Sequence, residues 1–143
     1  LSGIDVTDDV RSQKAGAGAS DVAVIGSVRQ KLVNIQRSLA KGMSVIMDGR
    51  DIGTVVLPNA ECKIFLTASP QCRAQRRYKE LIEKGENVKY EDVLNDVNER
   101  DYNDSHRKIA PLKPSEESVI ADTSKLSLDE SIALIVKIIK EHM

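Results

Sequence analysis

Residues 45–53 read Val-Ile-Met-Asp-Gly-Arg-Asp-Ile-Gly, so an apolar run passes directly into a cluster of charges. The run from Ser44 to Met47 has no polar alternation, which is typical of a strand covered on both faces. The charged residues after it would lie at the carboxyl edge of a sheet, where open α/β folds bind ligands. The stretch therefore predicts an α/β fold with a site for an anionic, hydrogen-bonding small molecule, for which a nucleotide fits best.

The segments on either side of this stretch carry further helix and strand patterns. A helix is predicted from Asp21, because apolar residues recur at steps of three and four: Ile25, Val28, Leu32, Ile35 and Leu39. Gly42 stands where a left-handed helix cap belongs. A second strand is predicted at 63–66, after a turn at Pro58-Asn59.

Two helices are predicted in the middle of the chain. The first has Ser69 as its N-cap and Pro70 at its first position, runs to about Glu83 and closes at Gly85. The second begins near residue 90, continues through residue 107, and ends before the prolines that follow. Both lie between the strand at 63–66 and the next strand along the chain.

The last part of the chain predicts a short strand and a helix. The strand covers 119–121, and Ser127 with Glu130 forms a capping box that opens the final helix. Its core stripe is Ile132, Ile135, Val136 and Ile139. Strands that alternate with helices predict a parallel sheet with right-handed crossovers.

Residues 14–20, Lys-Ala-Gly-Ala-Gly-Ala-Ser, superficially resemble a glycine-rich phosphate loop. No apolar strand precedes them and the order Gly-Lys-Ser/Thr is absent, so we reject that interpretation. A mobile link or an alanine-rich helical turn is the better one. Because the chain begins with Leu1 and three strands make a small sheet, we expect that an N-terminal part of the protein is missing from it.

Composition excludes several function classes. With 143 residues and a net charge of −1, the chain lacks the basic excess of a protein that grips a nucleic acid polymer. One Phe, three Tyr and no Trp offer no platform for stacking bases. No apolar run approaches the roughly 20 residues of a membrane span. Cys62 and Cys72 lack metal-ligand spacing and predict buried or idle thiols in a reducing compartment, so we expect a cytoplasmic protein.

Two clusters of arginine are candidates for binding phosphate. Arg100, Asp104 and Arg107 share one helix face, either as a solvated salt-bridge ladder or as a site where arginines bind phosphate and the acid accepts from sugar hydroxyls. Arg73, Arg76 and Arg77 also share a face. They form either a solvated basic surface or a group that neutralises charge on a triphosphate. His106 and His142 are expected to be surface histidines.

The acids at the end of the 44–47 run have two interpretations as well. Asp48 either caps the next turn or holds Mg²⁺, directly or through water. Arg50 and Asp51 would point into the same crevice, where Asp51 meets a cation or an amino group. A metal-dependent phosphatase built on Asp48 and Asp51 is disfavoured, because the further carboxylates that such sites gather are not evident.

Three motifs together resemble the bacterial cytidylate kinases, a family of nucleoside-monophosphate kinases. They are the stretch 48–56, the run 63–66, and residues 99–107 with Ala110-Pro111-Leu112. The resemblance covers essentially the whole chain. It implies a P-loop NTPase-type, three-layer α/β/α fold with a parallel sheet, here incomplete because the N-terminal strand and the P-loop are missing. Residues 1–20 would end the monophosphate-binding insert, and 21–143 would form the core, with a lid at about 70–90.

The resemblance also implies roles for individual residues. Arg50, Arg107 and Arg76 would be catalytic, the first two by holding the acceptor phosphate. The remaining substrate contacts would be Ser20, Arg29 and Asp51 at the cytosine, Arg100 and Asp104 at the pentose, and Arg11 in the same pocket. Arg73, Arg76 and Arg77 would form the lid over ATP. Asp48 would belong to the Mg²⁺ site.

The implied activity is transfer of the γ-phosphoryl group of ATP to CMP or dCMP, with Mg²⁺, by a monomeric protein. The chain alone is expected to transfer phosphate at a negligible rate, because the loop that holds the β- and γ-phosphates is missing. Two alternatives stay open. One is a kinase of the same fold for UMP, AMP or shikimate, and the other is a non-catalytic nucleotide-binding fragment.

Overall fold

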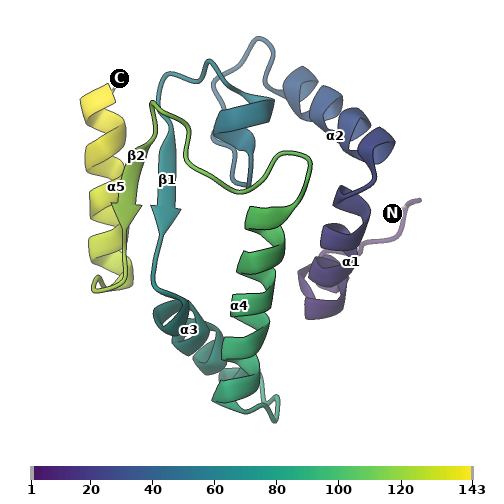
Figure 1. Cartoon of the computed structure of the whole chain (residues 1–143), viewed down its shortest axis with the longest axis vertical. Helices are drawn as coiled ribbons and strands as arrows, with labels where there is room; N and C mark the ends of the chain where they lie inside the picture. Colours follow the sequence, from purple (N-terminus) through teal and green to yellow (C-terminus); the bar gives the residue numbers. More distant parts are fainter. Residues whose placement is uncertain (1, 143) are drawn as a thin grey trace. The chain divides into compact units, whose positions relative to one another are not determined.

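The computed structural model describes residues 2–142, apart from the side chains of residues 11, 13, 17 and 20. The chain forms two compact units, Leu1–Ile46 and Met47–Met143, whose elements are labelled in Figure 1. We describe each unit separately. The domain boundary expected between residues 1–20 and 21–143 stays a prediction.

The first unit is helical. It contains a 3₁₀ turn, η1 (Asp9–Arg11), and two α-helices, α1 (Gln13–Ala23) and α2 (Gly26–Leu39). Ser12 caps α1 by accepting a hydrogen bond from the Ala15 amide at 3.2 Å. Residues 14–20 are therefore part of a helix, as the alanine-rich alternative predicted. The helix predicted from Asp21 is confirmed over Gly26–Leu39, but its start is wrong, because the backbone at Ile25 is extended and separates α1 from α2.

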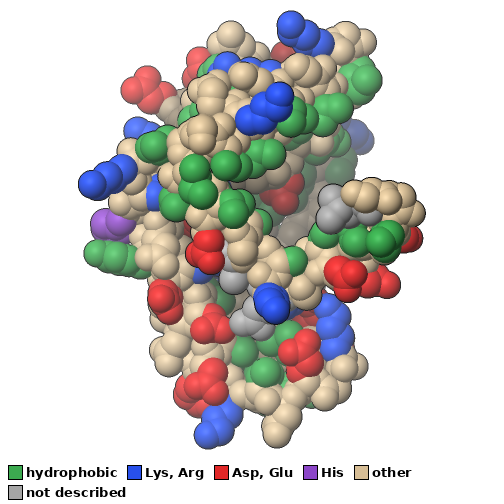
Figure 2. Space-filling model, turned by 90° about the vertical axis from the view of Figure 1, so that its right-hand side faces the viewer, with side chains coloured by type: hydrophobic (Ala, Val, Ile, Leu, Met, Phe, Trp, Pro, Cys, Tyr) green, Lys and Arg blue, Asp and Glu red, His purple; other side chains and the backbone are tan. Residues whose placement is uncertain are grey.

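The apolar stripe of α2 is mostly exposed. Only Val33 is buried on this helix, whereas Ile25, Leu32, Ile35 and Leu39 are 45–61% exposed. Two helices cover only a narrow strip of each other's surface, so most of the stripe finds no cover within this unit. Hydrophobic side chains at the surface are visible in Figure 2. Gly42 has the predicted left-handed conformation, with φ +76°.

The strand predicted at 44–47 is wrong. These residues lie in an irregular segment, and the side chain of Ile46 is 94% exposed. A strand needs a hydrogen-bonded neighbour, and the sheet in residues 2–142 consists of β1 (Ile64–Thr67) and β2 (Val119–Asp122) alone. An apolar run does not form a strand without such a partner.

The second unit contains the predicted parallel pair. β1 and β2 run parallel, with Ile64 opposite Val119 and Thr67 opposite Asp122. The strands at 63–66 and 119–121 are thereby confirmed, each within one residue. The structure has helices around a small parallel sheet, consistent with an incomplete α/β fold of the kinase type. A π-helical turn, η2 (Ile52–Val56), precedes β1 and buries Val56.

Two helices connect β1 to β2, and both were predicted. α3 (Pro70–Glu83) starts at Ser69, whose hydroxyl accepts from the Cys72 amide at 3.2 Å. Gly85 ends it with φ +80°. α4 (Tyr90–His106) packs against α3 through a core of Ala74, Leu81 and Val93, to which Tyr78, Val88, Tyr90, Leu94 and Val97 add contacts.

The final helix, α5 (Leu128–His142), packs on β2. Its capping box is confirmed: Ser127 N–H donates to the Glu130 carboxylate at 2.8 Å, and Glu130 N–H donates to the Ser127 hydroxyl at 3.2 Å. The predicted core stripe is partly wrong, because Ile138 is the buried residue while Ile132 and Val136 are 51% and 43% exposed. A helix against a two-stranded sheet buries only a narrow face.

Candidate active site

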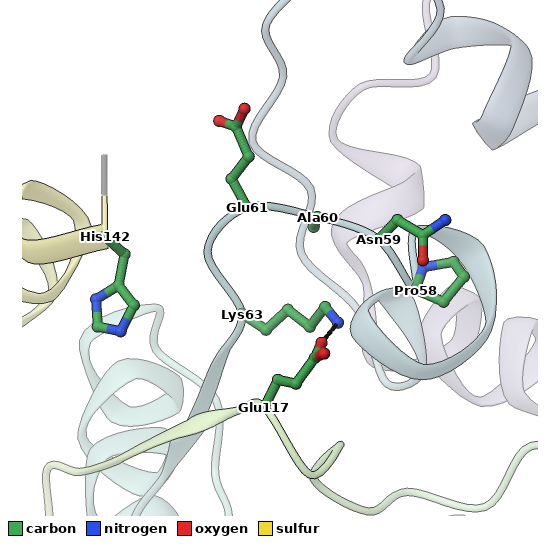
Figure 3. Close-up of a pocket in the computed structure, with 7 residues that line it drawn as sticks. All are labelled: Pro58, Asn59, Ala60, Glu61, Lys63, Glu117 and His142. Carbon is green, nitrogen blue, oxygen red and sulfur yellow. Dashed lines mark hydrogen bonds and ion pairs between the residues drawn. The ribbon is translucent and has the colours of Figure 1, made fainter.

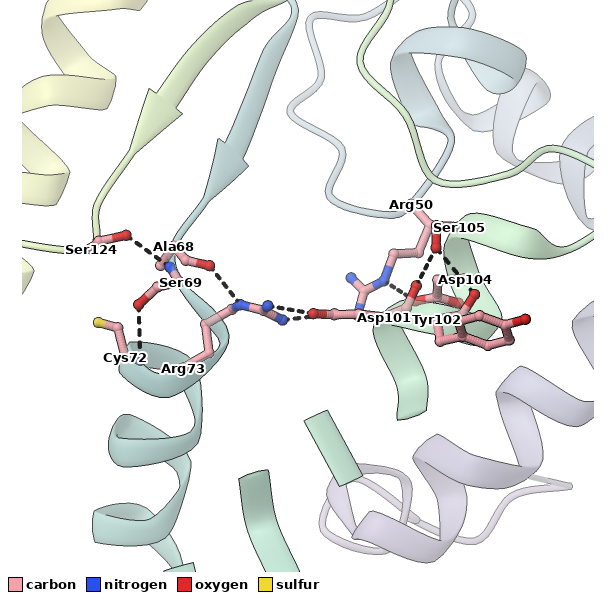
Figure 4. A network of polar contacts seen from close by, with 10 residues as sticks. All are labelled: Arg50, Ala68, Ser69, Cys72, Arg73, Asp101, Tyr102, Asp104, Ser105 and Ser124. Atoms are coloured by element: carbon pink, nitrogen blue, oxygen red, sulfur yellow. Dashed lines mark hydrogen bonds and ion pairs between the residues drawn. The ribbon is translucent and has the colours of Figure 1, made fainter. Parts of the chain in front are cut away.

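The carboxyl-terminal half of α4 carries a buried carboxylate, that of Asp104 (Figure 4). Its Oδ2 accepts a hydrogen bond from Arg50 Nε at 2.8 Å, and its Oδ1 lies 3.8 Å from Arg107 Nη1. The side chain is only 8% exposed. A buried carboxylate is tolerated because these cations compensate its charge. The sequence predicted Asp104 between Arg100 and Arg107 on one helix face. In the structure Asp104 contacts Arg107 and Arg50, while Arg100 is exposed.

Arg107 is held in the interior at the point where α4 ends. Its Nε donates to the Ala110 carbonyl at 2.5 Å, and its side chain is 13% exposed. Ala110 has φ +49°, a left-handed conformation that costs about 1 kcal/mol or more for a residue with a Cβ. The Leu112 amide also donates to the Asp104 carbonyl at 2.8 Å. The loop after α4 is therefore folded back so that Arg107 stays beside Asp104.

A second arginine reaches α4 from α3. Arg73 Nη1 and Nη2 donate to the two carboxylate oxygens of Asp101, at 2.8 and 2.5 Å, and Arg73 Nε donates to the Ala68 carbonyl at 2.9 Å. The Asp101 carboxylate raises the pKa of Arg73 above its usual range. Both side chains are about a third exposed. Sequence reasoning missed Asp101, although its position one helical turn before Asp104 places the two acids on one face of α4.

The other two arginines of α3 have different partners. Arg76 Nη2 donates to the carbonyls of Thr123 and Leu126, at 2.7 and 3.1 Å, and so joins α3 to the loop that follows β2. Arg77 pairs with Glu80 on the same helix. The three arginines of α3 thus do not converge on one point in this structure, and their grouping over a triphosphate stays a prediction.

The carboxyl ends of β1 and β2 meet beside these arginines. The Ser69 amide donates to the Ser124 hydroxyl at 2.8 Å, and the Thr123 hydroxyl donates to the Thr67 carbonyl at 3.1 Å. Figure 4 shows Ser69 and Ser124 near Ala68, whose carbonyl receives Arg73. Arg73 and Arg76 therefore lie at the edge of a parallel sheet at which open α/β folds place their ligands.

The acids of the 48–51 segment differ in their environment. Asp48 is exposed. The Asp51 carbonyl accepts from the amides of Val55 and Val56, at 2.8 and 3.2 Å, and so begins η2. In the part of the chain that the structure describes, no three His, Cys, Asp or Glu side chains gather as a metal site. The expected contribution of Asp48 to a Mg²⁺ site stays a prediction.

Three predicted substrate residues lie in the first unit. Arg29 is a half-buried residue of α2. Arg11 ends η1 and Ser20 belongs to α1, but their side chains lie outside the described atoms. Their grouping with Asp51 stays a prediction.

A hollow that the sequence did not predict lies at the amino end of the strands (Figure 3). Its volume is about 460 Å³, and it is lined by Pro58, Asn59, Ala60, Glu61, Lys63, Glu117 and His142. Lys63 has a side chain only 6% exposed, and it pairs with the exposed Glu117. This ion pair lowers the pKa of Glu117. The hollow contains none of the predicted site residues.

Two further expectations concern the cysteines and membrane-spanning helices. Cys62 and Cys72 are free thiols, as predicted. Among the described residues, no helix combines the length and the apolar character that crossing a bilayer requires.

Comparison with known proteins gives a consistent result. The sequence model of a family described as "Cytidylate kinase" matches residues 1–141. The chain is 48% identical over 141 residues to a cytidylate kinase of Thermosipho melanesiensis, covering 99% of this chain and 65% of that protein. It is 46% identical over 143 residues to a cytidylate kinase of Thermotoga neapolitana, covering 100% of this chain and 65% of that protein. The chain therefore spans just under two thirds of the length of these relatives.

Proposed function

This chain belongs to the cytidylate kinase family, and we propose that the protein transfers the γ-phosphoryl group of ATP to CMP or dCMP. The products would be ADP and CDP or dCDP. One observation supports the proposal above the others: the buried Asp104 holds Arg50 at 2.8 Å and lies 3.8 Å from Arg107. This arrangement fixes two cations from distant segments beside one another, which suits a phosphate monoester.

The proposed acceptor site uses these arginines as phosphate ligands. Arg50 and Arg107 would hold the acceptor phosphate, because planar guanidinium groups match phosphate oxygens in pairs. Arg100 and Asp104 would contact the pentose. Ser20, Arg29 and Asp51 would surround the cytosine, with Asp51 accepting from its amino group, and Arg11 would line the same pocket.

The proposed donor site lies on α3, where Arg73, Arg76 and Arg77 would cover the ATP phosphates. An acceptor phosphate oxygen attacks the γ-phosphorus in line, the bond to the β-phosphate oxygen breaks, and ADP leaves. The attacking oxygen is already an anion, so no strong general base is required. Catalysis then consists of positioning and of charge stabilisation by the arginines, among which Arg76 joins Arg50 and Arg107. Asp48 would contribute to a Mg²⁺ ion, which when bound neutralises charge on phosphate oxygens.

The choice of acceptor can be tested directly. In a full-length enzyme that contains this sequence, coupled ADP release is measured with CMP, dCMP, UMP, AMP and shikimate as acceptors. The proposal expects the highest kcat/KM with CMP or dCMP. A higher value with UMP, AMP or shikimate would instead identify a kinase of the same fold with another substrate.

The Asp51→Ala variant tests the cytosine contact in the same assay. A buried site built for particular hydrogen bonds can reject a mismatched base by roughly 10⁴-fold. We expect a loss of kcat/KM for CMP by about a hundredfold or more, with the KM for ATP within about twofold of the unmodified enzyme. An unchanged kcat/KM for CMP would contradict the assignment of Asp51.

A second candidate concerns the chain by itself. The order Gly-Lys-Ser/Thr, which cradles the β- and γ-phosphates in P-loop enzymes, does not occur in the 143 residues. This observation favours a nucleotide-binding piece without turnover. Calorimetric titration of the chain with CMP, beside an ADP-release assay, separates the two: heat of binding without ADP release supports the binding piece. ADP release at the rate of the full-length enzyme would refute it.

A further inference from the structure

We infer that Asp101 is a positioning residue for phosphoryl transfer: it holds the Arg73 guanidinium in a fixed orientation at the carboxyl edge of the sheet. The inference rests on the proposed function, which places Arg73 on the ATP side. It goes beyond that function by assigning a role to a carboxylate that does not itself touch a substrate.

The geometry at Arg73 leaves part of its guanidinium available. The group has five N–H donors, and three of them are used: Nε on the Ala68 carbonyl, and one each from Nη1 and Nη2 on Asp101. Nη1 and Nη2 therefore each keep one N–H directed away from Asp101. Because the Arg73 side chain is 36% exposed, a phosphate can approach these two donors from solvent.

Two fixed points define the orientation of Arg73. The Ala68 carbonyl follows β1 directly, and Asp101 lies on α4, so the guanidinium is anchored to the sheet edge and to a second helix (Figure 4). A free arginine at this place would lose the entropy of several rotatable bonds on binding phosphate. An arginine already held by two anchors loses less, which is the benefit of preorganisation.

The charges of Asp101 and Arg73 determine how kcat and the KM for ATP should change when Asp101 is replaced. Asp101 and Arg73 together are neutral, so the pair offers hydrogen-bond geometry at little net attraction for ATP. Removing the carboxylate charge would make the region more positive while releasing the guanidinium. We therefore expect loss of Asp101 to lower kcat and to leave the KM for ATP unchanged or lower. An interaction that is made only in the transition state gives this pattern.

The position of Asp101 also connects the two proposed substrate sites. Asp101 and Asp104 lie one turn apart on α4, the former receiving Arg73 and the latter receiving Arg50. A single helical turn thus fixes the spacing between an arginine of the donor side and an arginine of the acceptor side. A shift of about 1 Å between reacting groups can cost roughly a hundredfold in rate.

The test uses Asp101→Asn in the full-length enzyme that contains this sequence. Steady-state kinetics with CMP and ATP are measured together with the midpoint of thermal unfolding. We expect kcat to fall about ten- to a hundredfold, with KM for CMP and for ATP no higher than about twice the original values. Asp101→Glu restores a two-oxygen acceptor on a longer side chain and should recover most of kcat.

Glu99→Gln is the matched control. It removes one carboxylate from an exposed position of the same helix, so it changes the net charge of α4 by the same amount. We expect its kcat to stay within about twofold of the original value. If Glu99→Gln lowers kcat as much as Asp101→Asn does, the effect is one of net charge and the inference is wrong.

The remaining outcomes are also decisive. A full-length enzyme without CMP-dependent ADP release overturns the proposed function, and this inference with it. An active enzyme whose Asp101→Asn variant keeps its kcat, whether or not its unfolding midpoint falls, overturns the inference alone. An Asp101→Glu variant that unfolds at the original temperature but recovers no activity also contradicts it.

Discussion

Two arginine–aspartate pairs meet on α4, and they differ in how far water reaches them. In the Arg50–Asp104 pair the carboxylate is 8% exposed and the arginine side chain 43%, whereas in the Arg73–Asp101 pair both side chains are about a third exposed. The acids are one helical turn apart and chemically identical. Because the two acids differ in burial, they can be used to compare two contributions of an arginine–aspartate pair. One is to the stability of the fold, and the other is to the placement of a guanidinium.

Asp104 is coupled to the fold because it is buried together with Arg107, whose side chain is 13% exposed. Breaking a buried ion pair leaves an uncompensated charge in a medium of low dielectric constant. The partly exposed Arg73–Asp101 pair has no such cost, because either partner is readily solvated when the other is removed. We thus expect the stability of the protein to depend on Asp104 far more than on Asp101.

The largest expected effect comes from Asp104→Ala. This change leaves Arg107, whose side chain is 13% exposed, beside a cavity without its counter-charge. We expect the free energy of unfolding to fall by about 3 kcal/mol. Urea unfolding of the chain, followed by circular dichroism, measures it. A loss as small as that of Asp101→Ala would remove the distinction between the two pairs.

The N-cap of α3 tests how much the cap contributes to the stability of the helix that carries Arg73. Ser69→Ala removes the acceptor of the Cys72 amide and should lower the free energy of unfolding by about 1 kcal/mol. Ser105→Ala, within α4, is the control. Its hydroxyl donates to the Asp101 carbonyl one turn earlier, and alanine favours helix, so we expect a change below about 0.5 kcal/mol. Equal losses in the two variants would contradict the importance of the cap.

The third prediction, with a smaller expected effect, concerns how salt weakens the ion pairs on α4. A double-mutant cycle of Arg73→Ala and Asp101→Ala should give a coupling energy of about 0.5 kcal/mol at low salt, since the pair is partly exposed. At 1 M salt, where the screening length is about 3 Å, this coupling should largely vanish. The cycle of Arg107→Ala and Asp104→Ala, whose side chains are 13% and 8% exposed, should keep most of its coupling. Equal salt sensitivity of both cycles would mean that burial does not distinguish them.

The helices with local end signals could be predicted from the sequence. Ser69 and Pro70 open α3 and Gly85 closes it, and Ser127 with Glu130 opens α5. Each signal acts within a few residues, so its energy does not depend on the rest of the fold. The strand at 63–66 was predicted from the run that follows the turn at Pro58-Asn59, and it forms because its partner strand is also present in the chain.

The run at 44–47 shows where prediction from sequence fails. An apolar run indicates that a segment packs favourably against other apolar groups, but a strand forms only beside a hydrogen-bonded neighbour. In the described part of the chain the run has no such neighbour, and Ile46 is 94% exposed. Arg50 nevertheless contacts Asp104 although the strand expected to position Arg50 does not form, and the roles of both residues at a substrate stay predictions.

Contacts between distant residues were the least predictable part of the site. Arg73 and Asp101 are 28 positions apart, and Lys63 and Glu117 are 54 apart. No pattern of spacing links such residues before the fold brings them together. Lys63 is a particular case, because a lysine at the start of a strand is ordinarily solvated, and here its side chain is 6% exposed.

The Lys63–Glu117 pair reverses the arrangement on α4, since here the cation is buried and the acid is exposed. Lys63 lowers the pKa of Glu117 below its ordinary value of 4.5, so the unfolded chain binds a proton at a higher pH than the folded one. The contribution of Glu117 to stability is therefore present above pH 4.5 and is lost as the pH falls through the folded pKa. Glu117→Gln should flatten the decline of the unfolding free energy in this range, measured by urea titration between about pH 5 and pH 3.

A control with similar exposure completes this last test. Glu116→Gln removes the neighbouring exposed carboxylate, and we expect its stability to decline with acid as steeply as that of the unmodified chain. Because Glu117 is 76% exposed, its effect is the smallest of the four. If the two variants lose stability along the same pH curve, Lys63 does not hold the charge of Glu117. The dependence of an ion pair's contribution on the burial of one partner would then hold only for the pairs on α4.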